Sequence, residues 1–101
     1  TEFAQCLTEN NMKMYGSFRC GICAKTRAMF GDAFEHIIEY ECHPDGEDPR
    51  TERCQEINVI RTPMWVVEEA DGTVTDKSAG FTSPKKLAEM SGCSLDLIKQ
   101  N

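Results

Sequence analysis

Apolar positions near the start of the chain follow a helical spacing and then change to an extended one. Phe3, Cys6 and Leu7 lie three and four positions apart, which predicts one buried face of a short helix over residues 2–10. Residues 12–18 instead alternate between two faces, and both faces are mostly apolar. This pattern is typical of a central strand that helices cover on both sides.

A broad apolar face returns after Gly21 and predicts a second helix over residues 21–34. Lys25 and Arg27 fall off this face, so we expect both side chains to point into solvent. Gly31 and the aspartate after it should break or kink the helix, because glycine is a poor helix former.

The rest of the chain alternates between short apolar runs and loops rich in proline, glycine and charged residues. Asp71-Gly72 marks a hairpin turn, and Ser83 followed by Pro84 marks the start of a helix. The elements expected after the second helix are strands over 37–42, 64–68 and 73–77 and helices over 51–57, 84–90 and 94–100. This order predicts the α/β class with a mixed sheet, in a single domain over residues 1–101.

Composition narrows the functional classes that this domain can serve. A net charge of −6 argues against nucleic acid or an anionic membrane surface as the main partner. No apolar run is long enough for a membrane span, and six cysteines in 101 residues are typical of an oxidising compartment. Because the chain begins with Thr1 and shows no signal peptide, we expect a mature or trimmed form. We also expect the protein to act as a monomer.

Two cysteines, two residues apart, stand where the first strand gives way to the second helix. Cys20 precedes that helix and Cys23 lies in its first turn, so both thiols should lie on one face. Free N–H groups and the positive end of the helix dipole favour a thiolate at Cys20, and the charge of Arg19 adds to this. Cys20 is therefore the candidate nucleophile, and Cys23 the candidate that resolves a mixed disulfide.

Such a pair alone also suits zinc, an iron–sulfur cluster or a structural disulfide. Cys42, His43 and Cys54 could complete a ligand set, but they lack the second close pair that structural zinc sites use. We therefore expect no metal and no other cofactor. Pro63 stands directly before an apolar strand, and a proline at this place together with the cysteine pair favours redox chemistry.

Seven short segments between residues 12 and 92 carry a family resemblance. They are Met14-Tyr15-Gly16, Cys20-Gly21-Ile22-Cys23, Phe30-Gly31-Asp32-Ala33-Phe34, Tyr40-Glu41-Cys42, Cys54-Gln55-Glu56, Thr62-Pro63-Met64-Trp65 and Leu87-Ala88-Glu89-Met90-Ser91-Gly92. The chain resembles thioredoxin-like proteins of the DsbA and protein disulfide isomerase kind, and most closely the small thioredoxin-like domain fused to, or partnered with, bacterial vitamin K epoxide reductase homologues. The resemblance implies a thioredoxin fold: a central mixed four-stranded sheet flanked by helices, with Pro63 as a cis-proline before the third strand.

The function that the resemblance implies is protein thiol–disulfide exchange, as an enzyme. Protein substrates would bind beside the dithiol at Arg19, Thr62, Pro63, Gly80 and Phe81, where the Thr62 backbone could pair with an extended segment. The implied direction is disulfide formation or isomerisation in exported proteins, in a periplasmic or other extracytoplasmic location. A membrane quinone-linked vitamin K epoxide reductase homologue would re-oxidise the dithiol. The alternatives are a disulfide reductase of thioredoxin type and a non-catalytic module that binds a partner or a metal.

The chain departs from the family at the proton acceptor of the resolving cysteine. Thioredoxins and DsbA carry a buried acid six residues before the first cysteine, where this chain has Met14. Glu41 and Lys25 are near enough in sequence to be candidates for this proton acceptor, and the sequence favours neither of them. Arg19 and Gly21-Ile22 also replace the aromatic residue and the Pro-His or Gly-Pro pair that are frequent there.

Four further cysteines remain. The resembling domains carry a cysteine pair at the positions of Cys42 and Cys54, which implies a structural disulfide there, with a second redox pair as the alternative. Cys6 and Cys93 are left over near the two ends of the fold, and by elimination we expect them to pair. The alternative for these two is a pair of buried free cysteines.

Some apolar and acidic side chains have simpler roles in this interpretation. Phe18 and Phe81 flank the presumed site and should form an exposed apolar rim where unfolded polypeptide binds. Trp65 should be buried against the first strand. The acidic residues of the hairpin are expected to form a solvated edge that discourages strand pairing: Glu68, Glu69, Asp71 and Asp76.

Overall fold

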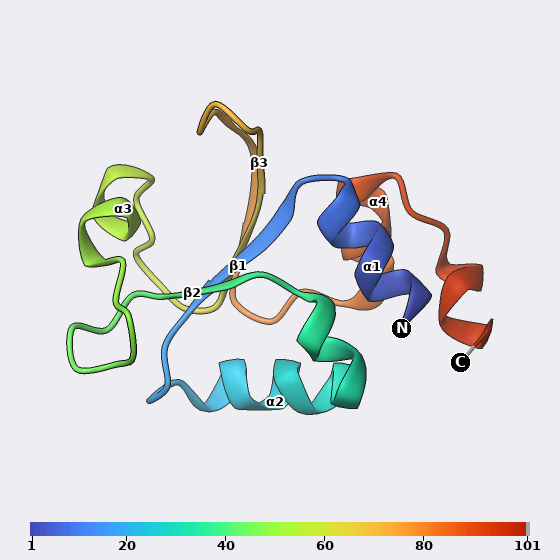
Figure 1. Ribbon diagram of the computed structural model, residues 1–101, viewed down its shortest axis with the longest axis horizontal. Helices are drawn as coiled ribbons and strands as arrows, with labels where there is room; N and C mark the ends of the chain where they lie inside the picture. Colours follow the sequence, from blue (N-terminus) through green and yellow to red (C-terminus); the bar gives the residue numbers. More distant parts are fainter. Residues whose placement is uncertain (101) are drawn as a thin grey trace.

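The computed structural model describes residues 1–100 as a four-stranded sheet with helices on both faces (Figure 1). The elements are α1 (Glu2–Glu9), β1 (Met12–Gly16), α2 (Gly21–Phe30), the 3-10 helix η1 (Gly31–His36), β2 (Glu39–Glu41), α3 (Thr51–Glu56), β3 (Met64–Glu68), β4 (Val74–Ala79), α4 (Pro84–Ser91) and the 3-10 helix η2 (Leu95–Gln100). The predicted order of helices and strands is confirmed. None of the helices within residues 1–100 is long and apolar enough to cross a bilayer.

The sheet is mixed, as predicted, with the strand order β2-β1-β3-β4. β1 runs parallel to β2 and antiparallel to β3, and β3 runs antiparallel to β4. The predicted hairpin turn joins β3 to β4, where the Gly72 N–H donates to the Glu69 carbonyl at 2.9 Å. Glycine suits this turn because its φ of 92° lies in the left-handed region.

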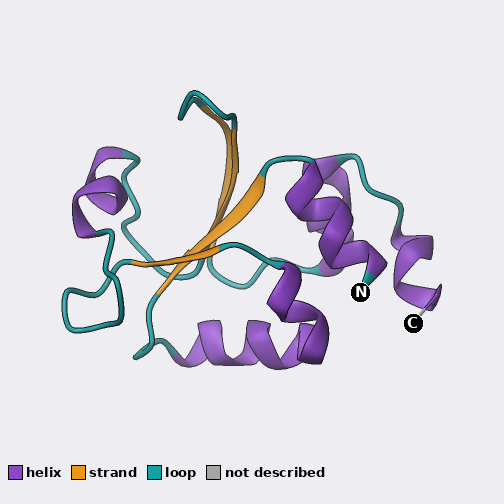
Figure 2. Ribbon diagram, viewed as in Figure 1, coloured by secondary structure: helices purple, strands orange, loops and turns teal. Residues whose placement is uncertain are grey.

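The two central strands, β1 and β3, separate two apolar cores. Side chains alternate along each strand, so Met14 and Trp65 face one core while Tyr15 and Met64 face the other. The first core packs against α1 and α4, and the second packs against α3 on the opposite side of the strands (Figure 2). Trp65 is fully buried, as predicted.

The strands differ from the predicted ranges at their ends. β1 stops at Gly16, two residues early, because the chain then turns: the Cys20 N–H donates to the Ser17 carbonyl at 3.2 Å. β2 keeps only the centre of the predicted run. β4 begins and ends later than predicted, because its last residue, Ala79, still pairs with Met64.

The helix that follows the dithiol buries a different face from the one predicted. Cys23 and Thr26 are its buried residues, and most of its apolar side chains are exposed. Arg27 does not point into solvent as expected, because it forms an ion pair with Glu39 of β2. The predicted break is confirmed: α2 ends at Phe30, and the chain tightens into η1 from Gly31 onward.

Glu68 does not belong to a solvated edge, so that prediction is wrong. Its position in β3 is two residues from Val66, so strand alternation points both side chains toward the α3 face. There the buried carboxylate accepts a hydrogen bond from the Tyr15 hydroxyl at 2.6 Å and pairs with Arg53 at 3.4 Å. Asp71 and Asp76 are exposed, as expected.

Two disulfides link distant parts of the fold. Cys42 after β2 is bonded to Cys54 in α3, as the resemblance implies. Cys6 in α1 is bonded to Cys93 after α4, the pairing expected by elimination. Cys20 and Cys23 are the free cysteines of the part of the chain that the structure describes.

Candidate active site

The turn after β1 places Cys20 at the N-cap of α2. Its backbone is extended, with φ −90° and ψ 115°, and its Sγ accepts a hydrogen bond from the Cys23 N–H at 3.1 Å. Cys20 is partly exposed, whereas Cys23 is fully buried behind it. The geometry therefore gives one thiol that a substrate can reach and a second thiol directly behind it.

The pKa of Cys20 lies below its usual value. Burial by itself would raise the pKa, but hydrogen bonds outweigh it, from the Cys23 thiol, the Thr62 side chain and the backbone N–H groups of Cys23 and Ile22. Each of these donors stabilises the thiolate more than the thiol. The expectation that the free N–H groups of the first helical turn favour a thiolate at Cys20 agrees with this set of donors.

The pKa of Cys23 is shifted in the opposite direction. Burial raises the pKa of Cys23 to about 12, and its hydrogen bond with Cys20 and the charge on Cys20 add to the effect. The Cys23 thiol therefore keeps its proton at neutral pH. Cys23 must transfer that proton before it can attack a disulfide.

The Thr62–Pro63 peptide lies directly beside the dithiol. The Cys20 thiol donates to the Thr62 carbonyl at 3.4 Å, and the Thr62–Pro63 bond is cis. The Pro63 side chain is buried, and the Gly80 N–H donates to the Pro63 carbonyl at 2.7 Å. The structure thus brings together three of the predicted binding residues, Thr62, Pro63 and Gly80, next to the nucleophile.

Arg19 lies close to the site but is held by other partners. Its guanidinium pairs with Asp45 at 3.5 Å and lies 5.3 Å from the centre of the Phe18 ring. Both charged groups of this pair are well exposed, so the pair contributes little energy. The lowered pKa of Cys20 has its causes in the hydrogen bonds above, and the charge of Arg19, expected to add to them, is not among these causes.

The segments that carry Cys20, Cys23 and Pro63, and the residue after Gly80, bear exposed apolar side chains. Phe18 and Phe81 are each about half exposed, at 51% and 53%, as expected for a rim. Ile22 and Ile60 are exposed as well, and neither was identified from the sequence. Ile60 is 90% exposed and lies in an irregular segment just before the cis-proline. An isoleucine outside any predicted helix or strand was the sequence signal that could have identified it.

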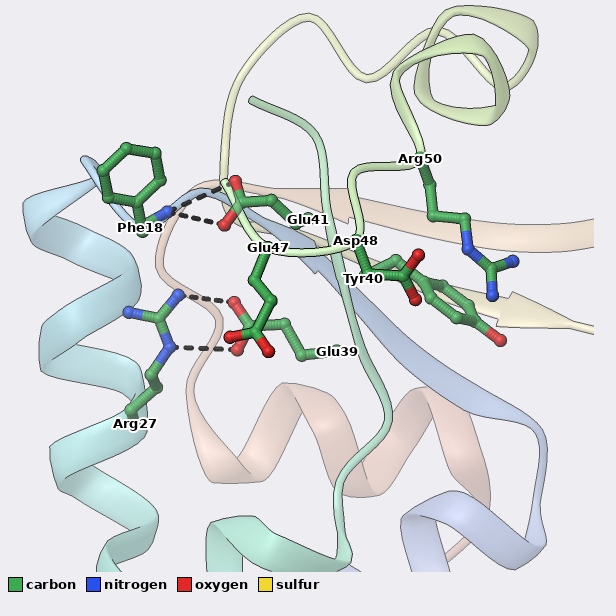
Figure 3. Close-up of a pocket in the computed structure, with 8 residues that line it drawn as sticks. All are labelled: Phe18, Arg27, Glu39, Tyr40, Glu41, Glu47, Asp48 and Arg50. Carbon is green, nitrogen blue, oxygen red and sulfur yellow. Dashed lines mark hydrogen bonds and ion pairs between the residues drawn. The ribbon is translucent and has the colours of Figure 1, made fainter. Parts of the chain in front are cut away.

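A charged cleft opens beside the site (Figure 3). It has a volume of about 500 Å³ and is lined by Phe18, Arg27, Glu39, Tyr40, Glu41, Glu47, Asp48 and Arg50. The Arg27–Glu39 pair lies within it, and the Phe18 N–H donates to Glu41 at 3.0 Å (Figure 3). The sequence did not identify Glu39 as a residue of the site, and Arg27 was expected in solvent. Two glutamates on a strand expected to be buried, Glu39 and Glu41, were a signal.

Neither residue considered from the sequence as proton acceptor for Cys23 is well placed for that role. The Glu41 carboxylate accepts hydrogen bonds from the backbone N–H groups of Phe18 and His43, both at 3.0 Å. Lys25 is exposed on α2. The proton acceptor must therefore be sought among other residues.

The alternative of a metal site loses two of its donors. Cys42 and Cys54 are bonded to each other, so neither sulfur is a free thiolate ligand. Within residues 1–100, no three side chains of His, Cys, Asp or Glu are grouped closely enough to hold a metal ion.

Alkylation should separate the two thiols by pH. Only the thiolate reacts, so the rate of iodoacetamide labelling at Cys20 should rise through a midpoint below the ordinary cysteine value of about 8.5. Cys23 should stay unlabelled until the pH approaches about 12. Peptide mapping by mass spectrometry of the reduced protein assigns each label. Labelling of Cys23 before Cys20, or a Cys20 midpoint above that of a free thiol, would contradict the assignment of roles.

No family model matches the chain. Thiol-disulfide oxidoreductase LTO1 of Arabidopsis thaliana is 32% identical over 97 residues, which make up 92% of this chain and 24% of LTO1. The chain thus spans about a quarter of the length of that relative.

A solved structure matches the fold as well. The crystal structure of mitochondrial thioredoxin 3 from Saccharomyces cerevisiae, in its oxidised form, has a TM-score of 0.57 and 18% identity to this chain. The match covers 90% of this chain and 86% of that thioredoxin. The likeness shows that the chain has the thioredoxin fold.

Proposed function

We propose that this protein is a thiol–disulfide oxidoreductase that acts on protein substrates through Cys20 and Cys23. The observation that carries the proposal is the pair of unequal thiols: one partly exposed with a lowered pKa, the other buried with a raised pKa. Such inequality is what a nucleophile and a resolving thiol require. The name of the relative LTO1, a thiol-disulfide oxidoreductase, supports the same activity.

The reaction follows from the positions of the two sulfurs. In the oxidised enzyme, a substrate thiolate attacks Cys20 Sγ, the Cys20–Cys23 bond breaks, and Cys23 leaves as a thiolate that takes up a proton. A second substrate thiolate then attacks the mixed disulfide at the substrate sulfur, and Cys20 leaves as a thiolate. The substrate loses two electrons and gains a disulfide, while the enzyme becomes a dithiol.

The surface around Cys20 fits an extended polypeptide. The Thr62 backbone beside the cis-proline can pair with a substrate segment, since strand addition needs only main-chain groups. Phe18, Ile60 and Phe81 offer exposed apolar contact on either side. Such contacts favour unfolded chains, which expose apolar side chains that folded proteins bury.

The direction that we propose is disulfide formation or isomerisation in exported proteins, outside the cytoplasm. The hydrogen bonds on the Cys20 thiolate stabilise the reduced form, which makes a disulfide more oxidising. Two structural disulfides in addition to the dithiol suit an oxidising compartment. The resemblance to partners of vitamin K epoxide reductase homologues supports a membrane quinone-linked partner that re-oxidises the dithiol.

A refolding assay tests this direction against a reductase of thioredoxin type. Oxidised protein should donate disulfides to reduced, denatured ribonuclease in a buffer without glutathione and so restore ribonuclease activity. The reduced protein, at the same concentration, is the control and should restore none. A protein that reduces insulin with a regenerating reductant but donates no disulfide to ribonuclease would be a reductase instead.

A further inference from the structure

The proposed reaction requires a group that removes and returns the proton of Cys23. Cys23 is fully buried, so bulk water does not reach its sulfur directly. The position six residues before Cys20 holds Met14, whose side chain is apolar and buried. Any proton acceptor must therefore approach Cys23 from another strand.

Gly16 lies between a carboxylate and the buried thiol. A side chain at this position would place its Cβ 2.6 Å from Glu39 Oε2, 3.2 Å from the Met14 methyl group and 3.3 Å from Cys23 Sγ. The carboxylate oxygen from β2 and the sulfur from α2 therefore both lie close to the side of Gly16 that has no side chain. Any larger residue at this position would fill the space between the carboxylate and the thiol.

Arg27 holds the Glu39 carboxylate in place from the opposite side. Its Nε donates to Glu39 Oε1 at 3.0 Å, and its Nη2 donates to Glu39 Oε2 (Figure 3). The same guanidinium donates to the Ser17 carbonyl at 3.3 Å, which ties the pair to the turn that carries Cys20. Each carboxylate oxygen has two lone pairs, so Oε2 can accept a proton while it keeps its bond to Arg27.

The cleft described above connects this carboxylate to solvent. Glu39 lines the cleft, and its side chain is 22% exposed. The other charged or titratable groups that line the cleft or contact Cys23 are Cys20, Arg27, Tyr40, Glu41, Glu47, Asp48 and Arg50. Glu47 and Asp48 are exposed on the loop after β2, whereas the Glu39 carboxylate lies close to Gly16 on the side where Cys23 Sγ also lies.

We propose that Glu39 is the proton acceptor of Cys23, with Gly16 as the gap that admits it and the charged cleft as its route to solvent. The inference deepens the proposed function and rests on it. When a mixed disulfide is resolved, the Cys23 proton passes to the Glu39 carboxylate and the Cys23 thiolate attacks Cys20 Sγ. The Cys20–Cys23 bond forms, the bond from Cys20 to the substrate sulfur breaks, and the substrate leaves as a thiolate with the electron pair.

Stopped-flow reaction of the reduced protein with 5,5′-dithiobis(2-nitrobenzoate) separates the two steps. Attack by Cys20 releases a first thionitrobenzoate, and attack by Cys23 on the mixed disulfide releases a second. In Glu39→Gln the first phase should stay within twofold of wild type, while the second should slow by about 10-fold or more at pH 7. The deficit should shrink as the pH rises, because solvent hydroxide then replaces the carboxylate as base.

Arg27→Met is the matched control, since it breaks the same ion pair but keeps the carboxylate. Its second phase should remain several-fold faster than that of Glu39→Gln. Glu89→Gln, which removes an exposed carboxylate of α4 outside the cleft, should leave both phases at the wild-type rate. If Glu39→Gln alone does not fold, the double variant Arg27→Met/Glu39→Gln removes both charges of the ion pair. Its second phase is then compared with that of the single variant Arg27→Met, which differs from it only in keeping the carboxylate.

The outcomes separate this inference from the proposed function. A wild-type second phase in Glu39→Gln from pH 6 to 9 would overturn the role of Glu39 while the first phase still supports a reactive Cys20. A wild-type protein in which Cys20 shows no fast first phase would overturn the proposed function, and the role of Glu39 with it.

Discussion

Replacing Cys20 with serine should abolish thiol–disulfide exchange, with a loss of at least about 10³-fold in rate, as is typical when a nucleophile is removed. Serine cannot form the mixed disulfide, and Cys23 is fully buried and holds its proton at neutral pH. Stability should change by less than about 0.5 kcal/mol, since Cys20 is partly exposed and the serine hydroxyl is also a good N-cap. Ribonuclease refolding and urea denaturation measure the two quantities.

Cys23→Ser is the companion variant. Cys20 would still react, but the mixed disulfide could no longer be resolved, so adducts between Cys20 and substrate proteins should accumulate and appear by intact mass. Retained turnover in Cys20→Ser would contradict the assigned roles. A large loss of stability in a chain without activity would instead support the non-catalytic module, in which all six cysteines are structural.

Removal of the Cys6–Cys93 disulfide should give the largest loss of stability. The double variant Cys6→Ala/Cys93→Ala opens a link across 87 positions, for which the chain-entropy model gives about 4 to 5 kcal/mol as an upper value. The link also holds α1 to the segment after α4, and both helices cover the same core. Urea denaturation followed by circular dichroism should show a much lower midpoint.

The second disulfide supplies the matched comparison. Cys42→Ala/Cys54→Ala opens a link across 12 positions, and the same model gives about 3 kcal/mol. The cost of the Cys6 and Cys93 variant should therefore be the greater of the two. An unchanged midpoint after loss of Cys6 and Cys93 would show that this disulfide does not stabilise the protein in solution.

Local signals in the sequence predicted most of the scaffold of the site. The helical spacing after Gly21, the extended spacing before it and the proline before the third strand each depend on a few neighbouring residues. The resemblance supplied their joint placement, since no spacing alone brings Thr62 to Cys20 across 42 positions. Nothing local indicated that Cys6 pairs with Cys93 either, and elimination supplied that pair.

The errors lie where two elements meet. The pattern of the helix around Arg27 predicts a solvent-facing side chain. Its ion pair with Glu39 depends on the contact between α2 and the edge strand β2, which that pattern does not contain. The sequence predicts Glu68 as one of the acidic residues of an exposed hairpin. Its carboxylate is buried because α3 covers it, where it pairs with Arg53 and accepts a hydrogen bond from Tyr15. Hydrophobic patterns describe the environment of one segment, whereas ion pairs between segments depend on strand order and register.

A glutathione redox titration tests the central claim most directly. The protein is equilibrated at defined ratios of reduced to oxidised glutathione, its thiols are trapped by alkylation, and peptide mass identifies which cysteines have changed state. We expect a reversible two-electron transition confined to Cys20 and Cys23, with a midpoint between about −120 and −180 mV, the range of oxidising members of this fold. A midpoint near about −270 mV would contradict the proposed direction and indicate a reductase. A pair that never titrates would contradict the oxidoreductase itself.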